Sequence, residues 1–270
     1  MRLTLRPVID AGAFLAAYDE LRSSMPSVPP HVGAERDGPL VRTVGWPRGG
    51  FVEYWDPVGL EGDALDELIA RQVQFFAERG ERFEWKTHAH DRPADLADRL
   101  RAAGFVADPR ETVLGALAGA IAAAPVLPPS VGLREATEQA DFERIADLDA
   151  RVWEDPNTHG LAAMLAERRA FDPHSIAVFL AEAENEVICA AWVRFRGDTA
   201  FATLHGGATL PGWRRRGIYR ALVATRAGLA AERGYRYLQV DASEDSRPIL
   251  ERLGFVAITT TTPFIWSPRG

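Results

Sequence analysis

The sequence predicts an α/β fold arranged as two similar domains. Segments in which apolar residues alternate, as in strands, are interspersed with segments that carry the helical period. A proline-rich junction at residues 125–132 separates two such regions, so we expect domains at residues 1–125 and 126–270. A chain of 270 residues is large for one core and comfortable for two.

A short pattern occurs in both halves. The segment AERGERF at residues 77–83 matches AERGYRY at residues 231–237, and a Gly-Phe pair follows each at nearly equal spacing. Each half thus has a helix ending at glycine, a strand, a short helix and a further strand. Chance similarity of two common helix endings is the alternative, but the matched order favours duplication.

The second half gives the clearest element boundaries. Strands are expected at residues 131–136, 176–181, 187–195, 199–209 and 237–241, with a last strand running toward 265, and helices at 138–153, 161–171, 218–233 and 247–253.

Composition limits the classes of function. The formal charge of −7 and the pI near 5.5 argue against broad nucleic-acid binding, which needs a basic face. Cys189 is the single cysteine and lies in an apolar strand pattern, which indicates packing. The N-terminus lacks the apolar run of a signal peptide, and the apolar stretch at 114–126 is too short to span a bilayer. We therefore expect a cytoplasmic protein, monomer or homodimer, without membrane contact.

An arginine-rich loop carries most of the chemical information. The segment TLHGGATLPGWRRRGIY, residues 203–219, reads as a strand, a tight turn, three arginines ending at Gly217, and the start of a helix. Free N–H groups and the dipole of a helix N-terminus attract phosphate, and the arginines add charged donors. The loop predicts an anionic, nucleotide-like cofactor. The matching segment of the first half, residues 57–63, has two acids and no arginine, so that half is interpreted as a degenerate copy.

The second half resembles the GNAT superfamily of acyl-CoA-dependent N-acyltransferases over about residues 131–266. The resemblance rests on the Thr-Leu-Pro step at 209–211, the loop Arg214-Arg-Arg-Gly217 and the Leu-Gly-Phe ending at 253–255. Tyr219 departs from the Gly or Ala that the family's loop usually has. The resemblance implies two tandem GNAT-like domains, each a mixed, mostly antiparallel sheet flanked by helices, the first without a phosphate loop.

The resemblance also implies acetyl-CoA as acyl donor, with its pyrophosphate on the arginine loop. Gly206 and Gly207 interrupt a strand, which indicates a bulge where the pantetheine arm pairs with the backbone; a merely structural bulge is the alternative. The residues expected to bind the cofactor are Ala208, Thr209, Leu210, Arg214, Arg215, Arg216, Gly217, Ile218, Tyr219, Ser243 and Ser246.

His205 is the candidate general base. It shares a strand face with Thr203 and occupies a position that faces the thioester in the family. A histidine hydrogen-bonded within the sheet is the alternative. The family's tyrosine that protonates the leaving thiolate is replaced by Leu250, so Ser246, Ser243 or water is left for that role. Reserve candidates for the base are Glu182, Glu154 and His174. The pair His88 and His90 lacks a third ligand, so no metal site is expected.

The sequence therefore predicts an N-acetyltransferase in which a small primary amine attacks acetyl-CoA directly. A non-catalytic acyl-CoA-binding or regulatory protein is the alternative, motivated by Leu250 and Tyr219. An ordinary nucleotide-binding protein is a third possibility, although the Rossmann and Walker patterns do not fit.

Overall fold

The computed structural model describes residues 9–55, 59–153 and 160–268. By their contacts these residues form two units, each built from segments that are not consecutive in the sequence. Unit 1 consists mainly of Leu114–Val240 and Pro248–Val256, and unit 2 of Ala11–Val113, Asp241–Arg247 and Ala257–Gly270. This division differs from the single boundary expected after residue 125, because the chain returns to unit 2 near its C-terminus.

Unit 1 contains most of the elements expected for the second half. Its strands are β7 (Gly132–Glu135), β8 (Ile176–Ala183), β9 (Glu186–Phe195), β10 (Phe201–Thr209), most of β11 (Tyr237–Ala242) and part of β6 (Glu111–Leu117). Its helices are α4 (Ala118–Ile121), α5 (Gln139–Trp153), α6 (Leu161–Phe171), the 3-10 turn η2 (Pro211–Trp213), α7 (Ile218–Glu232) and most of α8 (Arg247–Leu253).

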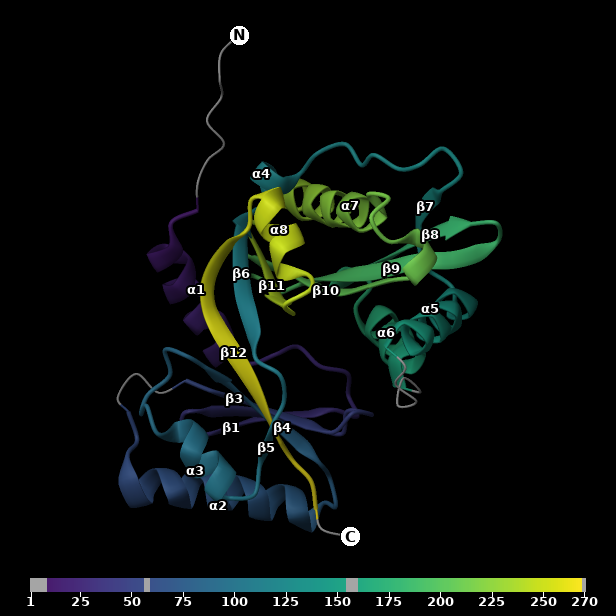
Figure 1. Ribbon diagram of the computed structural model, residues 1–270. Coiled ribbons are helices and arrows are strands. Elements are labelled where there is room, and N and C mark those ends of the chain that lie inside the picture. Colours follow the sequence, from purple (N-terminus) through teal and green to yellow (C-terminus); the bar gives the residue numbers. More distant parts are fainter. Residues whose placement is uncertain (1–8, 56–58, 154–159, 269–270) are drawn as a thin grey trace. The chain divides into compact units, whose positions relative to one another are not determined.

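The sheet of unit 1 combines antiparallel and parallel pairs of strands. β7, β8, β9 and β10 pair antiparallel in that order, and β10 pairs parallel with β11. Figure 1 shows α7 on one face of β8–β10, and α5 with α6 on the other. The core is apolar on both faces: Leu180, Ala191 and Val193 are fully buried.

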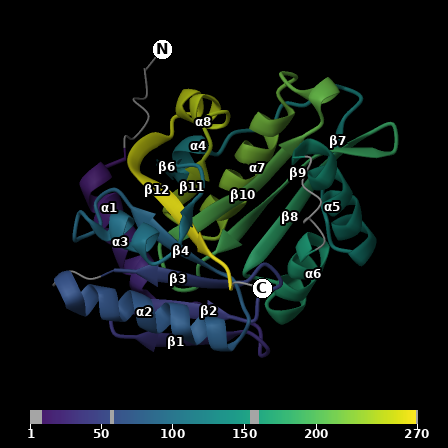
Figure 2. The same ribbon diagram turned by 60° about the horizontal axis from the view of Figure 1, so that its bottom comes forward.

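Unit 2 is built in the same way from the first half. Its helices are α1 (Ala11–Ser23), α2 (Gly62–Glu78) and α3 (Leu96–Ala102), and its strands are β1 (Gly33–Asp37), β2 (Leu40–Val44), β3 (Gly50–Tyr54), β4 (Phe83–His88), β5 (Val106–Ala107) and most of β12 (Val256–Trp266). β1, β2 and β3 pair antiparallel, β3 pairs parallel with β4, and β4 and β5 pair antiparallel with β12. Figure 2 shows α2 and α3 side by side on this sheet.

The apolar core of unit 2 explains this packing. α2 carries apolar residues at helical spacing, among them Leu65, Leu68 and Phe76, and all three are buried. The Phe76 ring stacks on Phe83 of β4 with ring centroids 4.0 Å apart. Trp85 of the same strand is completely buried, so it belongs to the core.

The two units share one order of elements. Each has three consecutive antiparallel strands (β1–β3 or β8–β10, with β7 in addition in unit 1), a long helix (α2 or α7), a strand parallel to the third (β4 or β11), a short helix (α3 or α8) and a last strand. The last strand of each half completes the sheet of the other unit: β12 pairs with β4, and β6 neighbours β11. The predicted fold class, α/β with a mostly antiparallel sheet flanked by helices, is confirmed. Among the described residues, no helix is long and apolar enough to cross a bilayer.

Candidate functional site

The arginine loop joins the end of β10 to the start of α7. Gly217 has φ +86°, a left-handed conformation that glycine adopts without strain, and it turns the chain into the helix. The first helical bond runs from the Ala221 N–H to the Gly217 carbonyl, at 3.0 Å. The three preceding N–H groups therefore have no acceptor within the helix, and they open toward the loop. This is the anion-binding geometry that the sequence predicts.

The three arginines leave their charges open to solvent. Arg214, Arg215 and Arg216 are all exposed. Arg214 donates through Nε to the Thr209 carbonyl at 3.1 Å, and the Arg216 guanidinium lies 4.7 Å from the centroid of the Trp213 ring. Both contacts fix the side-chain stems and leave the terminal nitrogens available to an anion. Three cations in consecutive positions give the loop a strong local positive potential.

β10 departs from its neighbour β11 just before the loop. The parallel pairing runs from Phe201 to Thr203 and ends there within the described structure. Further along the strand, the register with β9 shifts between Gly206 and Ala208, and both glycines have positive φ, +71° and +111°. The predicted bulge is therefore present. The β10 edge beyond Thr203 can offer main-chain groups to an extended ligand.

His205 lies at this divergence. Its Nε2 is 2.9 Å from the Thr203 hydroxyl, and its ring stacks nearly parallel to Trp192, at 10° with centroids 6.4 Å apart. Trp192 is the cross-strand neighbour of His205 on β9. The imidazole is half-buried, so it is oriented by protein groups and still reachable. Its role as a base stays a prediction.

Sequence reasoning missed Arg226, a buried arginine of α7 with 1% of its surface exposed. Its guanidinium donates to the carbonyls of Trp192 and His205, both at 3.1 Å, and to that of Leu222 at 3.1 Å. Burial lowers its pKa, and the nearby Tyr219 phenol counteracts this in part. The only sequence signal is its place four residues after Leu222, on the apolar face of the helix.

The backbone expected to meet the thioester arm is partly engaged. The Leu210 N–H donates to the Ile188 carbonyl at 3.0 Å, and the Leu210 carbonyl accepts from Trp213 at 2.9 Å. The Thr209 hydroxyl lies 3.0 Å from the sulfur of Cys189. Cys189 is buried, and burial raises the pKa of its thiol to about 11, so it is packing and not a nucleophile.

The remaining residues that the sequence predicts to bind the cofactor lie in two places. Ile218 is buried at the start of α7, and Ala208 is buried in β10. Ser243 and Ser246 belong to unit 2, where their hydroxyls are 3.2 Å apart in the turn before α8. Leu250 of α8 is completely buried, as a packing residue would be.

The reserve candidates are structural or lie outside the described residues. Glu182 accepts from Arg134 and Arg144 at 2.8 and 2.7 Å, and these partners lower its pKa. His174 is exposed and lies in the turn after α6. Glu154 lies outside the described residues.

His88 and His90 belong to a buried hydrogen-bond network of unit 2. The Tyr18 hydroxyl is 3.1 Å from Nε2 of His88, and Nε2 of His90 is 2.9 Å from Asp19. The part of the chain that the structure describes holds no cluster of three potential metal ligands.

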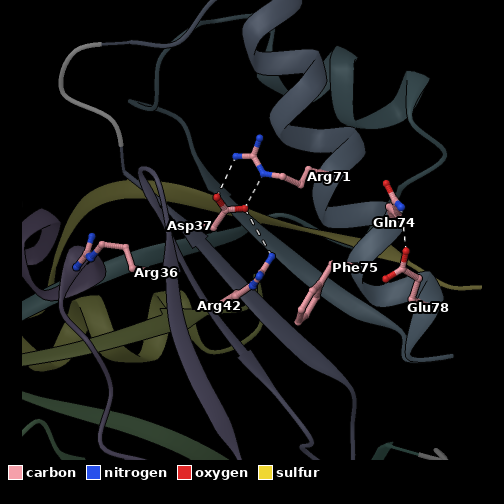
Figure 3. A pocket seen from close by; sticks show the side chains of 7 residues that line it. All are labelled: Arg36, Asp37, Arg42, Arg71, Gln74, Phe75 and Glu78. Atoms are coloured by element: carbon pink, nitrogen blue, oxygen red, sulfur yellow. Dashed lines mark hydrogen bonds and ion pairs between the residues drawn. The ribbon is translucent and has the colours of Figure 1, made fainter.

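A hollow of about 430 Å³ on unit 2 does not coincide with any predicted site (Figure 3). It is lined by Arg36, Asp37, Arg42, Arg71, Gln74, Phe75 and Glu78. Its side chains contact one another: Arg71 holds Asp37 through two bonds of 2.9 and 3.0 Å, and Arg42 stacks on Phe75 at 3.6 Å. We assign it no function.

Comparisons with known proteins agree with the fold. Residues 142–255 match the model of the acetyltransferase (GNAT) family. A GCN5-related N-acetyltransferase from Kribbella flavida superposes with a TM-score of 0.68 at 18% identity, covering 97% of each chain. A GCN5-related N-acetyltransferase from Sphaerobacter thermophilus gives a TM-score of 0.63 at 14% identity, covering 86% of this chain and 78% of that one.

A third structure shares the two-domain extent. A tandem GNAT protein from the clavulanic acid biosynthesis pathway gives a TM-score of 0.63 at 13% identity, covering 97% of this chain and 98% of that one. At these identities the structures establish the fold. No curated protein matches the chain.

Proposed function

We propose that this chain, which carries a GNAT-family domain at residues 142–255, is an N-acetyltransferase that uses acetyl-CoA to acetylate a primary amine. The observation that carries the proposal is the arginine loop at the N-terminus of α7, directly after the point where β10 leaves β11. The loop would hold the pyrophosphate, and the open strand edge would pair with the pantetheine arm.

The proposed reaction steps follow from where the pyrophosphate would lie. With the pyrophosphate on Arg214 to Gly217, the thioester reaches β10 beside His205. There a neutral amine attacks the thioester carbonyl, His205 accepts the proton of the attacking nitrogen, and the CoA sulfur leaves. Because both reactants occupy one cleft, proximity supplies much of the rate.

We propose that the acceptor is a small primary amine that approaches the protein as its ammonium cation. It attacks after it has lost a proton, as the neutral amine. The net charge of −7 favours the approach of cations over that of anions, nucleic acids included. We further propose that the first half is a degenerate GNAT copy without donor binding, and that the protein acts in the cytoplasm.

Calorimetry with acetyl-CoA tests the donor. We expect acetyl-CoA to bind, and ATP or NAD to bind at least about 10-fold more weakly. An ordinary nucleotide-binding protein would show the opposite order of affinities. The variant Arg214→Ala/Arg216→Ala should lose about 10-fold or more in affinity, because it removes two of the loop's cations. Arg151→Ala/Arg169→Ala, which removes two arginines of α5 and α6, is the matched control and should bind like the wild type.

The completely buried Leu250 favours one second candidate, a non-catalytic acyl-CoA sensor. The two functions differ in turnover. We expect release of free CoA from acetyl-CoA in the presence of at least one member of a broad amine panel. Tight binding without release across the panel would favour the sensor.

A further inference from the structure

His205 is held by three neighbours, and its shortest contact is to a residue of its own strand. Its Nε2 lies 2.9 Å from the hydroxyl of Thr203, two residues earlier on the same face of β10. Thr203 is 4% exposed, so little water competes with the imidazole for this hydroxyl. The contact fixes which ring nitrogen is turned toward the strand.

The indole of Trp192 fixes the plane of the imidazole. Trp192 is the cross-strand neighbour of His205 on β9, and the two rings are within 10° of parallel with centroids 6.4 Å apart. The indole also lies across Gly206, where a Cβ would be 2.5 Å from its Cζ3 atom. Because the indole fills the space above Gly206, the imidazole cannot turn over the bulge.

The backbone that carries the two rings is fixed from α7. The guanidinium of Arg226 donates through Nη1 to the carbonyls of both Trp192 and His205, each at 3.1 Å. Arg226 is 1% exposed, so these hydrogen bonds are shielded from water. They hold the cross-strand pair in place beyond Thr203, where the pairing of β10 with β11 has ended.

The hydrogen bond to Thr203 bears on the tautomer of His205. A threonine hydroxyl can donate or accept, so the contact at Nε2 allows two arrangements. If the hydroxyl donates, the lone pair of the neutral imidazole is on Nε2 and is already used. If the hydroxyl accepts, Nε2 carries the proton and the lone pair is on Nδ1. Only the second arrangement lets His205 take up a proton without first losing its bond to Thr203, and the bond persists in the imidazolium because Nε2 is still a donor.

We propose that Thr203 and Trp192 are positioning residues that prepare His205 as the base. Thr203 accepts a hydrogen bond from Nε2–H and so keeps the lone pair on Nδ1, while Trp192 sets the plane of the ring. The inference rests on the proposed function, because it needs His205 to take the proton of the amine.

The step that these residues prepare is a transfer of one proton and one acyl group. The amine nitrogen forms its bond to the acyl carbon, and its proton passes to Nδ1 of His205. The electron pair of the C–S bond goes to sulfur, so CoA leaves as a thiolate. Nε2 keeps its proton and its bond to Thr203 throughout, and the imidazolium later releases the added proton to water.

The tautomer of His205 can be observed in the free protein, without cofactor or acceptor. The chain has six histidines, so ¹⁵N-histidine-labelled wild type is compared with His205→Gln to identify the signals of this ring. Long-range ¹H–¹⁵N correlation spectra at pH ~8, where an ordinary histidine is neutral, show which nitrogen carries the proton. We expect the proton on Nε2. A proton on Nδ1 would make Thr203 the donor and overturn the proposal.

Thr203→Val removes the hydroxyl and keeps the shape of the side chain. Because the lost hydrogen bond favours one tautomer, the ratio of the Nε2–H form to the Nδ1–H form should fall about 5-fold or more. Thr203→Ser, which brings back a hydroxyl, should recover the wild-type ratio. Thr199→Val is the matched control: its hydroxyl accepts from the Phe201 N–H just before β10, and its loss should leave the ratio unchanged. Equal ratios in wild type and Thr203→Val would show that Thr203 does not set the tautomer.

Turnover distinguishes positioning from a merely structural role. With acetyl-CoA and the best amine of the panel, kcat should fall about 5-fold or more in Thr203→Val, while the KM for acetyl-CoA stays within about 2-fold. Trp192→Leu should lower kcat in the same way without changing the tautomer ratio, because the bond at Nε2 is intact. Trp192→Phe, which keeps an aromatic ring, should recover most of kcat. An unchanged kcat, or a loss confined to KM, would remove the residue concerned from the proposal.

The outcomes separate this inference from the proposed function. If the wild type acetylates an amine, and Thr203→Val and Trp192→Leu both keep its tautomer ratio and its kcat, the positioning roles fail and the proposed function stands. If the wild type releases no CoA with any amine of the panel, the proposed function fails and the positioning roles fail with it.

Discussion

Each unit places a buried arginine where its parallel strand pair ends, but the two arginines have opposite surroundings. In unit 2, Arg22 of α1 donates to the Tyr54 carbonyl at 2.7 Å, one residue beyond the last paired residue of β3. In unit 1, Arg226 donates to the His205 carbonyl at 3.1 Å, two residues beyond the last paired residue of β10. Each arginine is 1% exposed.

The difference lies in the partners. Asp91 accepts from Arg22 through both oxygens at 2.9 and 3.1 Å, and Asp19 accepts at 3.0 Å. Burial lowers the pKa of Arg22, yet Asp91 more than compensates, and the net shift is upward. Arg226 donates to backbone carbonyls and interacts with the Tyr219 phenol, without a carboxylate partner among the described residues, and burial lowers its pKa. Unit 2 closes its strand divergence with an ion pair, whereas unit 1 keeps a cation without a carboxylate partner at the divergence where we propose that the thioester lies.

This comparison fits our proposal that only unit 1 binds the cofactor. A closed divergence gives no backbone to a ligand, and its neutralised arginine gives no electrostatic help to a leaving anion. If the first half is the degenerate copy that we propose, the absence of arginines from residues 57–63 and the ion pair at Asp91 would both reflect a structural role.

The largest expected effect comes from removing the Arg22–Asp91 ion pair of unit 2. Asp91→Ala leaves Arg22 buried without its bidentate partner, so we expect a loss of about 3–5 kcal/mol in the free energy of unfolding. Urea denaturation followed by circular dichroism measures it. Asp98→Ala is the control, because Asp98 pairs with Arg101 on the surface, with side chains 82% and 54% exposed, and should cost about 0–1 kcal/mol. Equal costs for both variants would mean that the ion pair does not close the strand divergence.

The next effect is the pH dependence of the stability of unit 2, which we expect to arise from His88 beside Asp91. Burial lowers the pKa of His88 to about 4, against the opposing hydrogen bond of Asp91, whereas an unfolded histidine titrates near about 6.5. Between these two pH values the His88 imidazole is protonated in the unfolded chain and neutral in the folded protein. The contribution of neutral His88 to the free energy of unfolding is therefore fully present above pH ~6.5. It is lost as the pH falls toward ~4, and the loss is on the order of 3 kcal/mol in total.

His88→Gln isolates this contribution from the carboxylates that titrate nearby. The difference in unfolding free energy between wild type and His88→Gln should shrink by most of that amount as the pH is lowered from 7 to 4. His174→Gln, at an exposed histidine, should show the wild-type pH dependence. A constant difference between wild type and His88→Gln at all pH values would show that His88 does not resist protonation.

Much of unit 1 could be predicted from the sequence because its signals are local. The helix at Leu161–Phe171 has the predicted bounds, and α7 begins at Ile218 as predicted, since helical period and glycine positions are encoded within each segment. The bulge at Gly206 and the left-handed Gly217 follow from glycine at places where other residues would be strained.

The rest depends on partners distant in the sequence. Alternation marks 256–266 as a strand but does not say which strand it pairs with, so the exchange that brings β12 to β4 was not predictable. Arg22 and Asp91 are far apart in the chain, and nothing local marks them as a pair. Arg226 looks like an ordinary helical arginine until the sheet beneath it is known.

The smallest expected effect tests the fit between Gly207 and Tyr219. In unit 2 the register of β3 with β2 runs without a shift, so a bulge of this kind is confined to unit 1 in the described strands. Gly207→Ala adds a Cβ 2.7 Å from the Tyr219 ring at φ +111°, and should cost about 1–3 kcal/mol in unfolding free energy. Thermal denaturation measures it, with Gly228→Ala as control, since a Cβ at that position in α7 meets nothing within 4 Å.

A double-mutant cycle separates the two causes of that cost. In a Tyr219→Ala background the clash disappears and the backbone strain at Gly207 remains. Gly207→Ala should therefore lower the free energy of unfolding by less than in the wild type, but still measurably. A cost that is the same with and without the Tyr219 ring would place the ring away from the bulge.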